Sequence, residues 1–139
     1  MSEYVEVKTA FQDPTALVAA LMETGHWKAE QIEVHPEVQN LYGYHGDVRS
    51  QRAHIIIRRA YVGPASNDIG FERQADGRFV GHISEYDRTS RGYNEEWNRR
   101  LRQNYAFHAT RIPQEARGRR VTREWLPNGH QRVVIEGYR

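Results

Sequence analysis

The segment with the most distinctive chemistry is 42–46 (YGYHG), where two glycines alternate with aromatic side chains. Glycines let a backbone approach a ligand closely, and aromatic rings offer faces on which a base can stack. Two arginines follow closely, and their planar forks of donors suit a phosphate. We therefore predict a ligand-binding site at Tyr42, Tyr44, His45, Arg49 and Arg52. The alternative is an aromatic turn that only covers the core, because glycines most often mark turns.

A second candidate group is the dense run of arginines between residues 88 and 123. Arg99 and Arg102 are three residues apart, so on a helix they lie on one side and can clamp one phosphate. Trp97 adds an aromatic residue, a mixture typical of single-strand and nucleotide binders. Arg99 and Arg102 are thus also predicted ligand-binding residues. The alternative is that Glu95 and Glu96 pair with Arg99 and Arg100 at the helical spacing i, i+4.

Charge is distributed unevenly along the chain, although its net charge is only +2. Residues 1–48 contain two basic and eight acidic residues, whereas residues 49–139 contain 18 arginines and ten acidic residues. The two parts therefore have net charges of −6 and +8. This asymmetry favours an anionic partner, either nucleic acid or a nucleotide. The alternative is a solvated face whose arginines pair with nearby carboxylates.

Residues suited to catalysis or metal binding are scattered. The seven histidines lack the spacing of metal ligands, and neither a Gly-x-Ser-x-Gly elbow nor a G-x-x-x-x-G-K phosphate loop is present. Serine stands beside acidic residues at 66–68 (SND) and 84–87 (SEYD). We predict no catalytic residue, no metal and no cofactor. A metal-dependent hydrolase is the minor alternative, with Glu85 and Asp87 on one side of a strand and a histidine nearby.

Length and composition are those of one globular domain, which we expect to span residues 1–139. Charged residues make up 27% of the chain and there is no cysteine, so disulfides and thiolate chemistry are excluded. The apolar runs are far shorter than the 18 or so residues of a membrane-spanning helix. The first residues lack the features of a signal peptide. We expect a cytoplasmic protein with no membrane partner.

Periodicity predicts the elements that must position these residues. A helix should follow Asp13-Pro14, because an N-cap and a first-turn proline precede an apolar stripe. It should end at Gly25 in the left-handed conformation that glycine favours. A second helix should present apolar residues from Trp97 to Ile112. On this stripe we expect His108 to be a hydrogen-bonded core histidine. Its other side should carry Asn98, Arg99, Arg100 and Arg102, and Pro113 should kink or end the helix.

Alternating and β-branched segments predict strands. We expect them at 3–11, 52–61, 67–73, 78–83, 119–126 and 130–138, and two short extended candidates, 31–35 and 39–44, are separated by Pro36. Asp76-Gly77 and Asn128-Gly129 should close two hairpins. The element order β-α-β-β-β-β-α-β-β predicts an α+β domain, a mainly antiparallel sheet with both helices packed on one face.

Several short motifs, in this order and spacing, resemble one known family. They are the turn 43–46 (GYHG), 53–58 (AHIIIR), 67–71 (NDIGF), 103–108 (QNYAFH) and the closing hairpin with 128–129 (NG) and 133–135 (VVI). The family is the domain-of-unknown-function family number twelve fifty-seven, which includes chloroplast hypothetical open reading frame thirty-five proteins and has relatives in bacteriophage genomes. The resemblance implies a compact α+β fold in a cytosolic or stromal setting. It implies no activity.

Two functional hypotheses follow. The first is a non-enzymatic binding protein that holds a phosphate-bearing anionic ligand, either nucleic acid or a free nucleotide, including a sequestered signalling nucleotide if a phage encodes the protein. The second is an interaction or assembly module that forms a homo-oligomer, through its oppositely charged halves or an edge strand such as residues 3–11.

Overall fold

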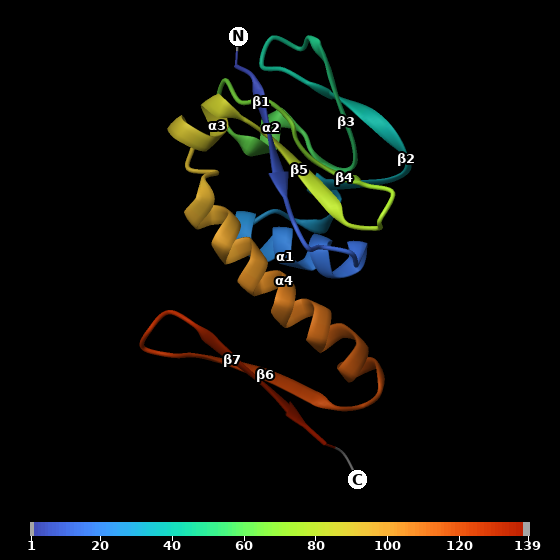
Figure 1. Ribbon diagram of the computed structural model, residues 1–139, viewed down its shortest axis with the longest axis vertical. Helices are drawn as coiled ribbons and strands as arrows, with labels where there is room; N and C mark the ends of the chain where they lie inside the picture. The colour runs from blue at the N-terminus through green and yellow to red at the C-terminus, as the bar shows by residue number, and fades with distance from the viewer. Residues whose placement is uncertain (1, 138–139) are drawn as a thin grey trace.

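The predicted strands build a five-stranded antiparallel sheet. In the computed structural model, which describes residues 2–137, they are β1 (Tyr4–Lys8), β2 (Ile32–Tyr42), β3 (Val48–Ile57), β4 (Ile69–Arg73) and β5 (Phe79–Ser84). The strand order is β1-β5-β4-β3-β2, and every neighbouring pair is antiparallel (Figure 1). The predicted α+β class is confirmed.

Two helices cover one face of this sheet, as predicted. They are α1 (Pro14–Gly25) and α4 (Glu95–Ala116), seen between the sheet and the C-terminal hairpin in Figure 1. Asp13 caps α1 by accepting a hydrogen bond from the backbone N–H of Thr15. The core between helices and sheet is made of large apolar side chains that are almost fully buried: Leu17, Leu21, Ile55, Ile57, Phe71, Trp97 and Leu101. No helix within residues 2–137 is both long and apolar enough to cross a membrane.

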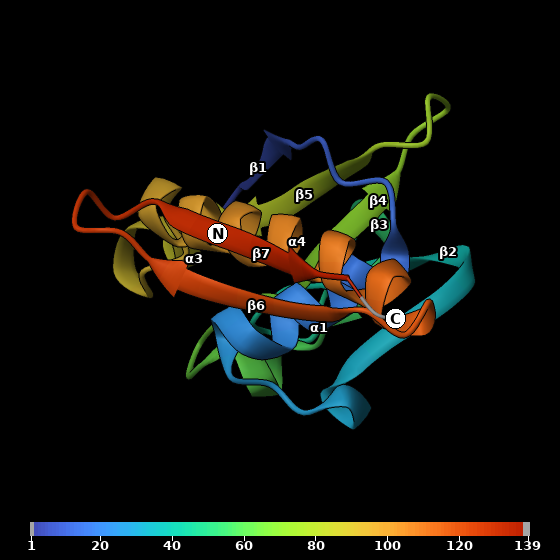
Figure 2. The same ribbon diagram turned by 90° about the horizontal axis from the view of Figure 1, so that it is seen from below.

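The predicted C-terminal hairpin forms a separate small sheet of β6 (Arg120–Trp125) and β7 (Gln131–Glu136). It packs on the side of α4 that faces away from the main sheet (Figure 2). A two-stranded hairpin is at best marginally stable by itself. Its stability here depends on α4, where the Gln131 side chain donates to the Gln103 carbonyl at 2.6 Å.

Three predictions about the long helices need correction. Helix α4 continues through Pro113 to Ala116, because a proline in the last turn removes only one backbone hydrogen bond. Asn98 is buried rather than exposed, because it lies three residues before Leu101 at the margin of the apolar stripe. The left-handed residue after α1 is His26 (φ 57°), not Gly25. Gly25 instead leaves room for the Trp27 ring, which would lie 2.2 Å from an added Cβ.

Two short helices form where the sequence predicted no helix. The predicted strand 52–61 ends at Ile57 and is followed by α2 (Arg59–Val62), whose first N–H donates to the Asp68 side chain. The segment 85–90 forms α3 (Glu85–Ser90), capped by Ser84. Glu85 and Asp87 therefore do not share one side of a strand.

The two strands predicted around Pro36 are one strand, β2, which follows the short 3₁₀ turn η1 (Ala29–Gln31). The pairing of β2 with β3 is nonetheless interrupted, with a register shift between Val34 and Gln39. This is the effect expected of a proline, which cannot donate to the ladder. The shift bends the hairpin away from regular pairing.

Candidate functional site

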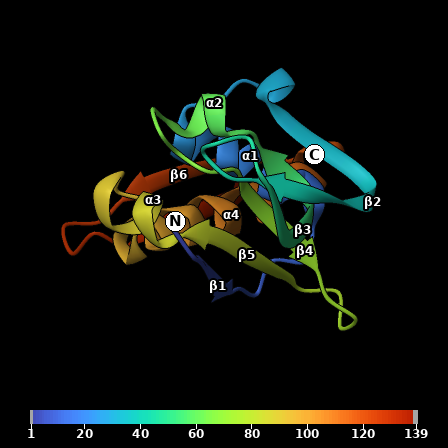
Figure 3. The same cartoon turned by 90° about the horizontal axis from the view of Figure 1, so that it is seen from above.

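The bent β2–β3 hairpin folds its tip over the second face of the sheet. Leu41 and Ala53 of the hairpin pack in a small buried cluster with Ile56 and Tyr4. The approach is close at Gly70 in β4, where an added Cβ would lie 2.6 Å from the Cβ of Ala53. The hairpin tip thereby reaches the end of the sheet where β4 begins, β5 ends and α3 starts (Figure 3).

Asp68 fastens this tip to the start of β4. Its side chain is 1% exposed and accepts hydrogen bonds from the backbone N–H groups of Tyr42 (2.7 Å) and Arg59 (2.6 Å). Arg58 adds a charged hydrogen bond to the same carboxylate at 2.9 Å and also pairs with Glu33. The Arg58 guanidinium holds the pKa of Glu33 below its usual range. One buried carboxylate thus joins three segments of the chain.

The two serine-containing segments meet directly behind Asp68. The backbone N–H of Asn67 and the hydroxyl of Ser84 both donate to Oδ2 of Asp87, at 3.0 and 2.7 Å. The Asn67 amide donates to Ser84 at 2.9 Å, and its oxygen accepts from the N–H of Tyr44 at 3.0 Å. All the side chains of this network except Tyr44 are buried. Tyr44 is therefore held from below by a rigid polar layer.

A cavity of about 240 Å³ opens above this layer. Tyr44 and Tyr86 supply aromatic walls, and Ser2, Ala65 and Asn67 complete the lining. Ala65 has φ 59°, a left-handed conformation that is uncommon for alanine and costs of order 1–3 kcal/mol. Such strain concentrates at functional sites. We call this space the Tyr44 cavity.

Arginines hold the walls of the Tyr44 cavity. Three of them donate to backbone carbonyls: Arg49 to Ser2 (2.7 Å), Arg59 to Tyr44 (3.0 Å) and Arg91 to Pro64 (2.7 Å). The Arg91 guanidinium also lies 5.9 Å from the centre of the Tyr86 ring. Within residues 2–137 neither Arg59 nor Arg91 forms an ion pair with a carboxylate. Two arginines without a carboxylate partner in residues 2–137 therefore contact the cavity lining or the residue next to it.

The structure gathers part of the predicted site at this cavity. Tyr44 lines it, Arg49 supports it, and the ring of His45 contacts that of Tyr44, with 3.8 Å between ring centres. Tyr42 lies instead against Arg58, 5.4 Å from the guanidinium, and Arg52 is exposed in β3. Gly43 does not serve the approach of a ligand, because its own neighbour Asp47 fills that space.

Arg99 and Arg102, the other predicted site residues, lie on α4. Arg99 binds Glu96 through two hydrogen bonds of 2.6 and 2.9 Å, and Arg102 binds Glu95 at 2.8 Å. In the described part of the chain no hydrogen bond or ion pair joins them to the Tyr44 cavity. The predicted i, i+4 pairs are not observed in the described residues, and the two glutamates pair with Arg99 and Arg102 at spacings of three and seven instead.

Sequence reasoning missed Tyr86, Asn67, Arg59 and Arg91 as parts of a site. A signal for two of them was present, because Asn67 precedes β4 and Tyr86 follows β5. In an antiparallel hairpin the beginning of the first strand lies beside the end of the second. The observed register, Gly70 opposite His82, brings these flanks together. The serine-containing segments 66–68 and 84–87 could therefore have been predicted to lie side by side.

In residues 2–137 no group of three or more histidine, aspartate or glutamate side chains has the arrangement that holds a metal ion. His35 and His82 bind Glu33 and Glu72. His108 binds Glu23 at 2.8 Å and accepts from Arg111, so it is hydrogen-bonded as predicted, but it is half-buried rather than part of the core. Burial lowers its pKa.

Comparison with known proteins places the chain in one family. The family described as "Protein of unknown function (DUF1257)" matches residues 29–134. The match includes Tyr44, Asn67, Tyr86 and the arginine-bearing helix α4, and it begins after α1. No curated protein and no solved structure matches the chain. Since the match covers well over half of the residues, the resemblance seen in the sequence is confirmed, and the chain belongs to the DUF1257 family.

Proposed function

We propose that this protein binds a small phosphate-bearing ligand, a mononucleotide, at the Tyr44 cavity without catalysing a reaction. The observation that carries the proposal is an aromatic cavity with two arginines, Arg59 and Arg91, bound to backbone beside its lining and without a carboxylate partner in residues 2–137. Arg59 uses its Nη1 for the Tyr44 carbonyl, which leaves other N–H groups of its guanidinium available to a phosphate.

The size of the cavity favours one base over a larger ligand. Its volume of about 240 Å³ lies just below the range of roughly 300–1,000 Å³ that is typical for drug-sized ligands. A single base fits between Tyr44 and Tyr86, where the Asn67 side chain lies at the floor. The phosphate then remains at the rim beside Arg59 and Arg91.

A free nucleotide is favoured over a nucleic acid for the same reason, because the site accommodates one base. Binding of a nucleic acid would instead extend over many phosphates and weaken steeply with salt. A relationship to the chloroplast proteins of the family, a phage origin and a cytoplasmic location remain predictions.

Isothermal titration with AMP, adenosine and ribose 5-phosphate tests the proposal. We expect AMP to bind, and both fragments to bind at least tenfold more weakly, because each loses either the phosphate or the base. Tyr44→Ala and Arg59→Gln should each weaken AMP binding by about tenfold, which corresponds to one charge-assisted hydrogen bond or one stacked base.

Arg102→Gln is the matched control, since Arg102 is an arginine that already has a carboxylate partner. An unchanged affinity restricts the site to the Tyr44 cavity, whereas a loss equal to that of Arg59→Gln extends it to α4 as the sequence predicted. Absence of binding by AMP, GMP, CMP and UMP at millimolar concentration overturns the proposal.

Self-assembly is a second candidate function, and the position of β1 favours it. Within the described residues β1 pairs only with β5, so its other edge presents unpaired backbone groups. Such an edge can extend a sheet into a second copy. Sedimentation velocity over a hundredfold range of concentration tests this, and a monomer throughout excludes it.

A further inference from the structure

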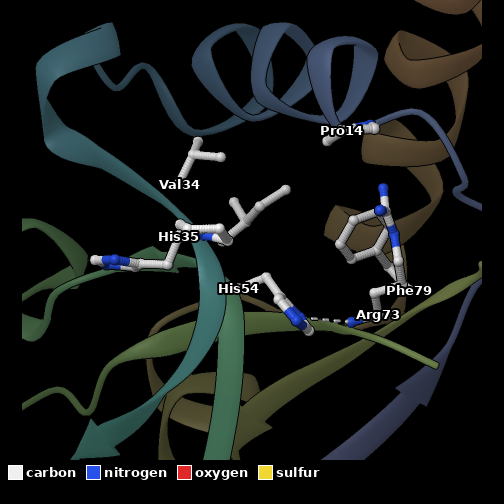
Figure 4. A pocket seen from close by; sticks show the side chains of 8 residues that line it. Pro14, Val34, His35, His54, Arg73 and Phe79 are labelled. Atoms are coloured by element: carbon white, nitrogen blue, oxygen red, sulfur yellow. Dashed lines mark hydrogen bonds between the residues drawn. The ribbon is translucent and has the colours of Figure 1, made fainter.

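A second, larger cavity lies on the helix-facing side of the sheet, beside the first residue of α1 (Figure 4). Its volume is about 500 Å³, and Pro14, Val34, Ile55 and Phe79 form apolar walls. Val34 is 57% exposed although it pairs with the buried Ile55 and shares its face of the sheet. An exposed β-branched side chain on a core face shows that no element within residues 2–137 covers this region.

The cavity exists because two elements end there. The pairing of β2 with β3 is interrupted directly after Val34, where Pro36 follows. Helix α1 begins only at Pro14, so its apolar face covers the sheet from that point onward. The volume lies within the range of roughly 300–1,000 Å³ typical of small-molecule sites, and apolar walls are also typical.

The polar groups of this cavity are hydrogen-bond donors. The backbone N–H of Arg73 donates to Nδ1 of His54 at 3.0 Å, so the neutral ring carries its proton on Nε2. The Arg73 guanidinium lies 4.9 Å from the centre of the Phe79 ring and has no carboxylate partner within residues 2–137. His35 points away from the cavity in Figure 4 and binds Glu33 at 2.7 Å.

We propose that this cavity binds a small apolar carboxylate, such as a medium-chain fatty acid. Its carboxylate would accept hydrogen bonds from the Arg73 guanidinium, and its hydrocarbon part would contact Val34, Ile55 and Phe79. A guanidinium presents two parallel donors that match a carboxylate. The apolar walls exclude a ligand that is polar throughout, such as a sugar phosphate. The site is separate from the Tyr44 cavity, so it does not depend on the function proposed there.

Titration with three eight-carbon probes tests this proposal, followed by ¹H–¹⁵N NMR of the whole chain. Octanoate should bind saturably and shift the amide signals of Val34, His54 and Arg73. Octanol, which lacks the charge, should bind at least tenfold more weakly, and octylammonium should not bind. Equal affinity of octanoate and octanol, or no saturable binding of octanoate at millimolar concentration, overturns the proposal.

Substitutions of Arg73 and Val34 test where the carboxylate and the hydrocarbon part of the ligand bind. Arg73→Gln should weaken octanoate binding about tenfold, the loss of one charged hydrogen bond, and the exposed position of Arg73 keeps the fold intact. Arg78→Gln, at the other end of the same hairpin turn, is the matched control and should change nothing. An equal loss with both variants overturns the proposal.

Val34→Asp should abolish octanoate binding, because it places a carboxylate in the apolar wall, whereas Val34→Leu should preserve it. AMP binding should be unaffected by either change. Retention of octanoate by Val34→Asp overturns the assignment.

Discussion

Arginines behave differently in two regions of this molecule. Beside the Tyr44 cavity, Arg59 and Arg91 donate to backbone carbonyls and have no carboxylate partner in the described residues. On α4, where arginines are denser along the sequence, Arg99 and Arg102 are each bound to a glutamate of the first helical turn. The density of arginine in a sequence therefore does not measure the positive charge that is available to a ligand.

The carboxylates that join elements beside the cavity and beside the C-terminal hairpin also differ. Asp68, which joins the elements around the cavity, has a side chain only 1% exposed. Glu23, which joins α1, α4 and the C-terminal hairpin, is 39% exposed and binds Arg123 and His108. Buried charged groups cost more to leave unpaired than solvated ones. The region around the cavity should thus be the less tolerant of substitution.

Removal of the Asp68 carboxylate is the strongest test of this comparison. Asp68→Ala leaves Arg58 and the N–H groups of Tyr42 and Arg59 without their acceptor, and we expect a loss of about 3–5 kcal/mol in the free energy of unfolding. Urea denaturation measures it. Asp76→Ala, in an exposed turn, is the control and should cost about 0.5 kcal/mol. A loss below about 1 kcal/mol for Asp68→Ala would refute the comparison.

Removal of the Arg123 charge should have a smaller and more local effect. Arg123 binds Glu23 and Asn104 and lies 3.8 Å from the centre of the Phe107 ring. Arg123→Met keeps much of the apolar stem and should cost about 2 kcal/mol, the value of charged hydrogen bonds.

Hydrogen exchange shows whether this loss is local. The amides of β6 and β7 should exchange faster in Arg123→Met, while those of β3 to β5 keep their protection, because a lone hairpin is marginal. Equally faster amide exchange in both sheets would contradict the prediction that the C-terminal hairpin is a separate, less stable region.

Sequence patterns predicted the elements whose determinants are local. The helix after Asp13, the two hairpins closed by Gly77 and Gly129, and the long amphipathic helix all rest on residues within a few positions of one another. The strand predicted over 52–61 was wrong at its end, because Asp68, nine residues beyond Arg59, starts a helix there. Such a contact leaves no periodic signal.

The site was predictable only in part, for the same reason. The segment 42–46 was recognised, but its partners 66–68 and 84–87 come from loops that only the strand register brings together. The bend at Pro36 was read as a gap between two strands, although it is the feature that carries Tyr44 to its place. The sequence did not show which arginines lack a carboxylate partner, because several pairings of glutamate and arginine were possible at helical spacings.

Acidification should destabilise the region around Glu23. The loss in the free energy of unfolding should be smaller than the loss caused by Arg123→Met. Burial lowers the pKa of His108, and hydrogen bonds from Arg123 and His108 lower the pKa of Glu23 despite its partial burial. A group whose pKa is lower in the folded state contributes its full stabilisation above the pKa of the unfolded chain. This contribution is lost as the pH falls below that pKa. Stability should therefore fall first below pH 6.5 and again below pH 4.5.

The variant His108→Gln separates the two steps, since glutamine keeps a donor for Glu23 but does not titrate. Urea denaturation between pH 5 and 8 should show a flatter profile for this variant. Identical slopes for the variant and the original chain would remove His108 as the cause.

Substitution of the α4 glutamates should have the smallest effect on stability. It nevertheless tests whether pairing with glutamate makes the α4 arginines less available to an anion than Arg59. Glu95→Gln together with Glu96→Gln frees Arg102 and Arg99 from exposed ion pairs, which contribute little to folding. We expect an unchanged unfolding midpoint but later elution from heparin in a salt gradient, because phosphate- and sulfate-binding charge is released. Arg99→Gln added to the double variant should reverse part of that shift. An elution position that does not change would mean that these arginines are as available as Arg59, so that pairing does not distinguish the two regions.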